Sequence, residues 1–264
     1  MSLHPLDAAG TVPDVNAIFD RFARQSARTR AERPCLRNVS YGESAAETLD
    51  FFPAGAGAPL AVFFHGGYWR RLDKEHFSFI AQGLVPLGVS FASVNYALAP
   101  MTRLPEIVEQ ARRAVTWIRD NHARLDFNPE RVVVFGHSAG GHLAAMAGVS
   151  IPVRGVASIS GLHDLHQVRA SFVNEWLSLS EAEARALSPV LHRPARPFPL
   201  YVTAGEKESD DGFKAQGHAL VAAWKPYGCD AAYEDARGDD HFSVMFRMMN
   251  PGNALTQKIA QLAR

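Results

Sequence analysis

Short apolar runs alternate along the chain with longer segments whose apolar residues recur at helical spacing. Five runs are rich in Val, Phe, Ile and Leu and lack strict polar–apolar alternation: 60–64 (LAVFF), 89–94 (VSFASV), 132–135 (VVVF), 156–159 (VASI) and 200–203 (LYVT). Strands that helices cover on both faces have this pattern. We also expect an early antiparallel strand at 48–52 and a last strand at 231–234.

The segments between these runs predict helices. Apolar residues fall near helical spacing in 104–124, and 139–149 and 213–227 are similar. An amphipathic patch at 15–30 predicts a helix in an N-terminal arm, residues 1–30. Alternating strands and helices predict an α/β sandwich with crossover helices. No linker is visible, so we expect a single domain over 1–264, with its reactive groups at the carboxyl ends of the strands.

Composition removes several classes of function. The 264 residues are 47% hydrophobic and 20% charged, as in an ordinary globular protein, and 27 Lys and Arg balance 27 Asp and Glu. A net charge of zero gives no field that would attract nucleic acid, and no apolar run approaches the roughly 20 residues of a membrane helix. The N-terminus does not resemble a signal peptide, so we expect a cytoplasmic protein that binds neither nucleic acid nor membrane. Two cysteines, Cys35 and Cys229, are too few for a disulfide framework.

The strongest chemical motif is Gly-His-Ser-Ala-Gly at 136–140, which matches G-x-S-x-G. It follows the run 132–135 and precedes the predicted helix 139–149, which is the context of a nucleophile elbow. A tight turn there lifts the hydroxyl of Ser138 above the sheet edge, and the helix N-terminus favours developing negative charge. A chance match in a glycine-containing turn is the alternative. The sequence therefore predicts Ser138 as a nucleophile.

A second motif, His-Gly-Gly-Tyr-Trp at 65–69, directly follows the run 60–64. Its two glycines allow the backbone to approach a substrate carbonyl, so the N–H groups of Gly66, Gly67 and Ala139 are expected to form an oxyanion hole. His65 could be considered as a base. We expect it instead to hold this loop, because the base of such hydrolases follows the serine in the chain.

Position along the chain selects the general base from eleven histidines. His241 follows the predicted last strand in a glycine-containing polar loop, whereas His218 lies within a predicted helix. The partner acid should lie in the loop after 200–203, where it would accept the Nδ1–H of His241. Four carboxylates compete there, and spacing does not choose among them: Glu206, Glu208, Asp210 and Asp211. Neither a C-x-x-C pair nor an H-E-x-x-H motif is present, so we expect no metal and no cofactor.

Several segments together resemble the kynurenine formamidase branch of the α/β-hydrolases, which is close to the hormone-sensitive-lipase-like esterases. They are HGGYW at 65–69, NYALAP at 95–100, RLPEIVEQARRAVTWI at 103–118, GHSAGGHLAA at 136–145, SGLHDLHQVRAS at 160–171 and DHF at 240–242. The resemblance covers about residues 40–250. It implies an α/β-hydrolase fold with a mostly parallel sheet of about eight strands, helices on both faces and a small helical cover. It is also compatible with a homodimer.

The resemblance also bears on the acid. Relatives carry an acidic residue followed by Ser shortly after the strand and before a Phe and a Gln. Here Glu208 and Ser209 precede Phe213 and Gln216 in the same way, which implies Glu208 as the acid. Relatives usually have Asp at this position, and the loop here is about one residue longer, so Asp210 and Asp211 remain alternatives.

The implied function is hydrolysis of a small molecule, an N-formyl aryl amide such as N-formylkynurenine. A short-chain carboxylesterase would use the same residues, and a non-catalytic hydrolase-fold binding protein is the third alternative. We expect an insertion at about 162–198 to form the small helical cover. Aromatic residues near the catalytic motifs and in this insertion are expected to line the pocket, with ordinary core packing as the alternative: Tyr68, Trp69, Phe172, Trp176 and Phe242.

Overall fold

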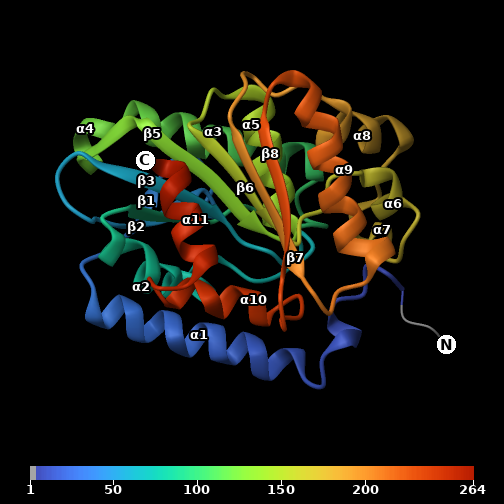
Figure 1. Cartoon of the computed structure of the whole chain (residues 1–264), viewed down its shortest axis with the longest axis horizontal. Coiled ribbons are helices and arrows are strands. Elements are labelled where there is room, and N and C mark those ends of the chain that lie inside the picture. Colours follow the sequence, from blue (N-terminus) through green and yellow to red (C-terminus); the bar gives the residue numbers. More distant parts are fainter. Residues whose placement is uncertain (1–3) are drawn as a thin grey trace.

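A computed structural model describes residues 4–264. Its centre is one sheet of eight strands in the order β1-β2-β4-β3-β5-β6-β7-β8 (Figure 1). The strands are β1 (Leu36–Ser40), β2 (Thr48–Phe52), β3 (Ala58–Phe64), β4 (Ser90–Val94), β5 (Phe127–His137), β6 (Gly155–Ile159), β7 (Pro199–Gly205) and β8 (Asp230–Ala236). Strand β2 pairs in antiparallel fashion with both of its neighbours, β1 and β4, and the other neighbouring strands, including β7 and β8, pair in parallel. The predicted α/β class and strand number are confirmed.

Helices cover both faces of the sheet. One face packs against α3 (Leu104–Asp120), α5 (Ala139–Ser150) and α9 (Ala215–Trp224), with α4 (His122–Leu125) beside β5. The other face packs against α2 (Ala81–Leu84), α10 (Ser243–Phe246) and α11 (Ala254–Ala263), and α1 (Val15–Glu32) lies outside these. No helix within residues 4–264 is long and apolar enough to cross a membrane.

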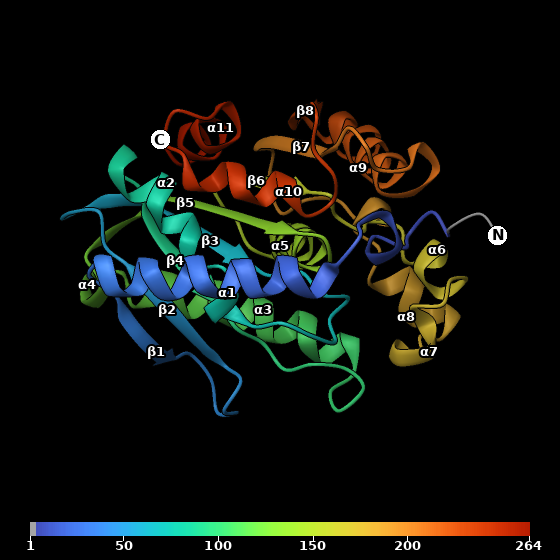
Figure 2. The same cartoon turned by 90° about the horizontal axis from the view of Figure 1, so that it is seen from below.

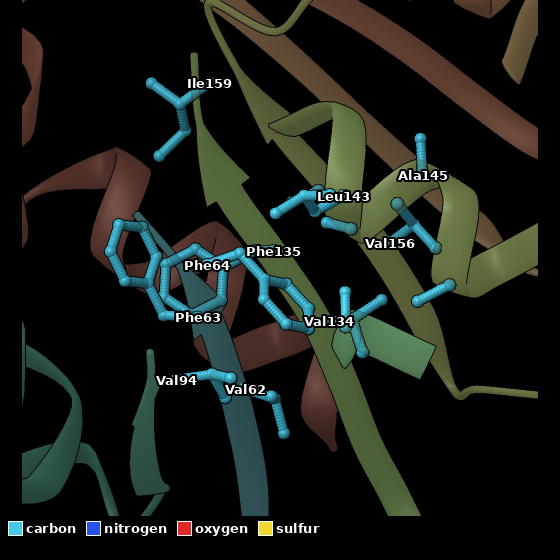
Figure 3. Packing of buried hydrophobic residues seen from close by; sticks show 14 of the residues in the cluster. Val62, Phe63, Phe64, Val94, Val134, Phe135, Leu143, Ala145, Val156 and Ile159 are labelled. Atoms are coloured by element: carbon cyan, nitrogen blue, oxygen red, sulfur yellow. The ribbon is translucent and has the colours of Figure 1, made fainter. Parts of the chain in front are cut away.

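The core lies on both faces of the central strands. Phe63 on β3 and Phe135 on β5 are register partners, and their ring centroids are 5.0 Å apart (Figure 3). Every residue of β4 and β6 is buried, whereas β1 at the sheet edge is mostly exposed. The sequence prediction missed β1 for this reason, because an exposed edge strand carries no apolar run.

The insertion 162–198 contains α6 (Leu165–Arg169), α7 (Asn174–Leu177) and α8 (Glu181–Ala186). The arrow of β5 points toward the end of the molecule where these helices gather (Figure 2). The described N-terminal segment that precedes α1 lies at the same end, and His4 packs against Phe172 with ring centroids 5.5 Å apart. The carboxyl ends of the parallel strands are therefore enclosed by segments from both the start and the middle of the chain.

Candidate active site

Ser138 occupies a sharp turn between β5 and α5. Its backbone has φ 55° and ψ −122°, a strained conformation for a residue with a side chain. Its N–H donates to the carbonyl of Ile159 at 2.8 Å, which fixes the turn to the neighbouring strand. A Cβ atom at Gly136 would overlap the backbone of Gly140, and one at Gly140 would overlap the carbonyl of Phe64. The motif needs glycine on both sides of the serine because the backbones meet there.

His241 and Glu208 form a buried pair on loops that follow β8 and β7. Their side chains are 4% and 3% exposed, and His241 Nδ1 lies 2.8 Å from Glu208 Oε2. The three other acids of the loop are bound elsewhere. Glu206 accepts the N–H of Gly238, Asp210 pairs with a lysine, and Asp211 accepts the hydroxyl of Ser209. Of the four carboxylates that the sequence left open, the fold brings Glu208 to His241.

The second carboxylate oxygen of Glu208 has its own donors. Ser160 Oγ donates to Glu208 Oε1 at 2.5 Å, and the backbone N–H of Gly205 donates to the same oxygen at 2.6 Å. Ser160 is fully buried directly after β6 and has a φ of 52°. Three donors, one at the end of β7 and two in the loops after β6 and β8, therefore fix the carboxylate. No sequence signal singled out Ser160, because its position matters only once β6 and β7 are neighbours.

The loop after β3 brings Gly66 and Gly67 next to the serine. A Cβ atom at Gly66 would lie 3.1 Å from Ser138 Cβ, so this backbone is in contact with the nucleophile elbow. Gly67 has φ 114°, which L residues rarely adopt. Within residues 4–264, neither glycine N–H has a hydrogen-bond acceptor. Ala139, in the first turn of α5, also has no intrahelical acceptor, so the segments next to Ser138 carry three N–H groups without an acceptor among residues 4–264.

His65 lies under this loop and away from the cavity that contains Ser138. Its Nδ1 is 2.8 Å from the carbonyl of Gly66, and its ring stacks on Tyr96 with centroids 4.1 Å apart. Burial lowers the pKa of His65 to about 4, so the imidazole is neutral near pH 7. These contacts are those of a side chain that holds the loop.

His137, the residue before the serine, is also buried and supports the opposite histidine. Its Nε2 lies 2.7 Å from the backbone carbonyl of His241, and the two rings are 4.7 Å apart. Burial holds the pKa of His137 well below its usual range. A neutral His137 that donates from Nε2 therefore ties the His241 loop to the nucleophile elbow.

Ser138 and His241 line one narrow cavity together with Gly67 and His137. Its volume is about 10 Å³, roughly the space that the centre of one water molecule needs. Most of the wall is apolar: Phe19, Phe22, Tyr68, Leu72, Phe77 and Phe242. A second space of about 490 Å³ shares His241 with the first, and it is also lined by Glu208 and by the N-terminal segment. The site is thus small next to the serine and wider beyond the histidine.

Comparison with known proteins identifies the family. Residues 51–157 match the BD-FAE family model. The chain is 30% identical to the kynurenine formamidase of Danio rerio over 251 residues, which are 89% of this chain and 84% of the relative. The kynurenine formamidase of Drosophila melanogaster is 28% identical over 86% of this chain and 82% of its own length. The chain belongs to the kynurenine formamidase family.

Solved structures agree with this assignment. A candidate thioesterase from Silicibacter superposes with a TM-score of 0.87, at 30% identity and 97% coverage of both chains. An esterase from Pyrobaculum calidifontis has the same fold, with a TM-score of 0.72 at 20% identity and coverage of 100% of this chain and 95% of that one. This member of the kynurenine formamidase family is therefore a hydrolase with the α/β-hydrolase fold.

The aromatic residues predicted for the pocket divide into two groups. Tyr68 and Phe242 line the cavity of Ser138. Trp69 does not, because it is fully buried and packs edge-on against His142, 5.1 Å away. Phe172 and Trp176 also do not line it. They pack against Tyr68 at 6.1 and 6.3 Å. The structure places these three side chains outside this cavity, and their contact with substrate stays a prediction.

The described N-terminal segment contacts Tyr68, one of the residues that line the cavity. The hydroxyl of Tyr68 donates to the carbonyl of Leu6 at 2.6 Å and accepts from the N–H of Ala8 at 3.2 Å. Sequence reasoning also missed Phe19 and Phe22 of α1, which line the cavity. Their spacing of three residues on the predicted N-terminal helix was the available signal, but periodicity does not reveal which surface an apolar helix face covers. In this kynurenine formamidase relative, the N-terminal arm is part of the pocket wall.

Proposed function

We propose that this hydrolase cleaves an N-formyl aryl amide, such as N-formylkynurenine, to the aryl amine and formate, with Ser138, His241 and Glu208 as its catalytic triad. The observation that carries the proposal is the buried His241–Glu208 pair, 2.8 Å apart, together with the cavity that His241 and Ser138 both line. Glu208 fixes the tautomer of His241 that leaves Nε2 free to accept a proton.

In the proposed first half-reaction, Ser138 Oγ attacks the formyl carbon while His241 takes the hydroxyl proton. The oxyanion accepts hydrogen bonds from the N–H groups of Gly66, Gly67 and Ala139. An anilide nitrogen is a poor leaving group until it is protonated, so His241 donates its proton to the nitrogen as the C–N bond breaks. The aryl amine leaves, and Ser138 retains the formyl group as an ester.

In the second half-reaction, water attacks the formyl-serine carbonyl and gives a proton to His241. The same three N–H groups stabilise the second oxyanion. His241 then returns the proton to Ser138 Oγ, and formate leaves. Glu208 accepts the Nδ1–H of His241 throughout and stabilises the imidazolium each time it forms.

One observation supports a formamide as the substrate. Relatives that match over more than four fifths of their length are named kynurenine formamidase. A short-chain carboxylesterase is the second candidate. It is supported by the 26% identity to esterase LipQ of Mycobacterium tuberculosis, over 72% of this chain and 53% of that protein.

Steady-state kinetics distinguish these candidates. We expect kcat/KM for N-formylkynurenine to exceed kcat/KM for p-nitrophenyl acetate and p-nitrophenyl butyrate. Undetectable formamide hydrolysis beside rapid ester hydrolysis would reject the formamidase and leave the esterase. Ser138→Ala should lower every activity by about 10⁴-fold or more. Wild-type activity in that variant would reject the serine-hydrolase mechanism.

A further inference from the structure

The cavity of Ser138 contains one charged side chain besides its histidines, Arg71, and the proposed mechanism does not use it. Arg71 follows the oxyanion loop and is half-buried. Its N–H donates to the carbonyl of Gly67 at 3.1 Å, which turns the loop back toward the site. The guanidinium carbon lies 5.5 Å from the ring centroid of Phe19, another wall residue. The cation is therefore held at an aromatic wall within the cavity.

Within residues 4–264, no carboxylate lies within ion-pair distance of Arg71, whereas Arg103 pairs with Glu183. The neighbouring Arg70 stacks on Trp176, with its guanidinium carbon 4.2 Å from the ring centroid. The carboxylate of Glu208 is already held by its three donors. Tyr68 cannot supply an anion either, since burial raises the pKa of its phenol to about 12.

A guanidinium without a partner in an apolar wall is suited to a planar anion. Its N–H groups form a fork that fits the two oxygens of a carboxylate, and the low polarity of the surrounding rings strengthens that interaction. The aromatic side chains from α1 and from the loops after β3 and β8 surround this part of the cavity with apolar surface. Figure 2 shows α1 running along the molecule to the end where the strands terminate, which brings its Phe19 and Phe22 to this wall.

We propose that Arg71 binds a carboxylate of the substrate, so that the enzyme prefers acyl compounds whose aromatic leaving group carries a carboxylate. The inference rests on the proposed function in one respect. If the transferred acyl group is formyl, the remainder of the substrate is the leaving group, so any carboxylate that reaches Arg71 lies on it. Arg71 is then a specificity-determining residue and takes no part in the proton transfers.

Two aryl esters that differ by one carboxylate test this preference. Phenyl acetate and 3-acetoxybenzoate share the acetyl group, and their hydrolysis is measured as kcat/KM at low ionic strength. In the wild type, 3-acetoxybenzoate should be preferred. In Arg71→Gln, the ratio of kcat/KM for 3-acetoxybenzoate to that for phenyl acetate should fall at least tenfold, mainly through KM. Arg71→Lys should retain part of the ratio, because it keeps the charge and loses the fork.

Arg70→Gln is the matched control, because Arg70 adjoins Arg71 but lies on Trp176 outside the cavity. It should leave the ratio unchanged. An unchanged ratio in Arg71→Gln, or an equal fall in Arg70→Gln, would overturn the role of Arg71. Failure to fold is recognised by circular dichroism, and Arg71→Lys then carries the test. Because both substrates are esters, absent formamide hydrolysis would reject the formamidase proposal without deciding the role of Arg71.

Discussion

Replacing Ser160 tests whether the fixed carboxylate of Glu208 matters for catalysis. Ser160→Ala removes the 2.5 Å hydrogen bond to Glu208 Oε1 and leaves the Gly205 N–H and His241 on the carboxylate. Hydrogen bonds to charged groups contribute about 1.5–3 kcal/mol. If that energy positions the carboxylate against the imidazolium of the transition state, kcat falls about 10- to 150-fold. KM should change little, because Ser160 is not part of the cavity wall.

Ser158→Ala provides the matched control. Ser158 is a fully buried serine two residues earlier, and its hydroxyl lies 2.9 Å from His163 Nε2 rather than near Glu208. Both variants should lose about 1–3 kcal/mol of unfolding free energy in urea titrations, because each removes a buried side-chain hydrogen bond. Only Ser160→Ala should lose kcat on p-nitrophenyl acetate. A folded Ser160→Ala enzyme within threefold of wild-type kcat, or an equal loss in Ser158→Ala, would refute the positioning argument.

Three further predictions concern the acid, the oxyanion loop and acid stability. Glu208→Gln should lower kcat by about 10³-fold or more. Glu206→Gln, on the exposed part of the same loop, should keep kcat within threefold of the wild type. A near-normal kcat in Glu208→Gln would exclude Glu208 as the acid. Gly67→Ala should lower kcat about 10²- to 10³-fold, because its φ of 114° is strained with a Cβ and the new atom would overlap the carbonyl of Arg71. Gly57→Ala, which also has a positive φ but an open surrounding, should retain full kcat, and similar losses in both would contradict a local effect. Burial lowers the pKa of three neutral histidines, to about 4 for His65 and His142 and to about 3 for His163. The unfolded chain, with histidine pKa near 6.5, takes up protons first as the pH falls, so unfolding free energy should decrease between pH 6.5 and 4 by about 1.4 kcal/mol per pH unit for each histidine. Equal urea midpoints at pH 7.5 and 5 would contradict this.

The local pattern of apolar residues predicted the central strands of the sheet. The runs that became β3 to β7 were visible because strands buried on both faces must be apolar throughout. The turn at Ser138 was visible because a strand, a helix and two obligatory small residues coincide there. The sequence did not predict β1, because the exposed side chains of an edge strand need not be apolar.

The pocket was less predictable because its walls come from distant parts of the chain. Trp69 is next to the oxyanion loop in sequence, yet its side chain packs into the core against His142. Phe19 is more than a hundred residues from Ser138, yet both line one cavity. Adjacency along the chain does not determine the direction in which a loop side chain points, whereas the packing of α1 over the sheet does.

The sequence by itself determined the order of strands and helices, the elbow that presents Ser138 and the place of His241 after the last strand. These follow from hydrophobic period and turn chemistry, which act over a few residues. Tertiary structure decided which of four carboxylates reaches His241, that Ser160 holds it, and that Arg71 joins the cavity. Such choices depend on how loops from several strands meet at one sheet edge. Burial and hydrogen bonding then select one partner among chemically similar side chains.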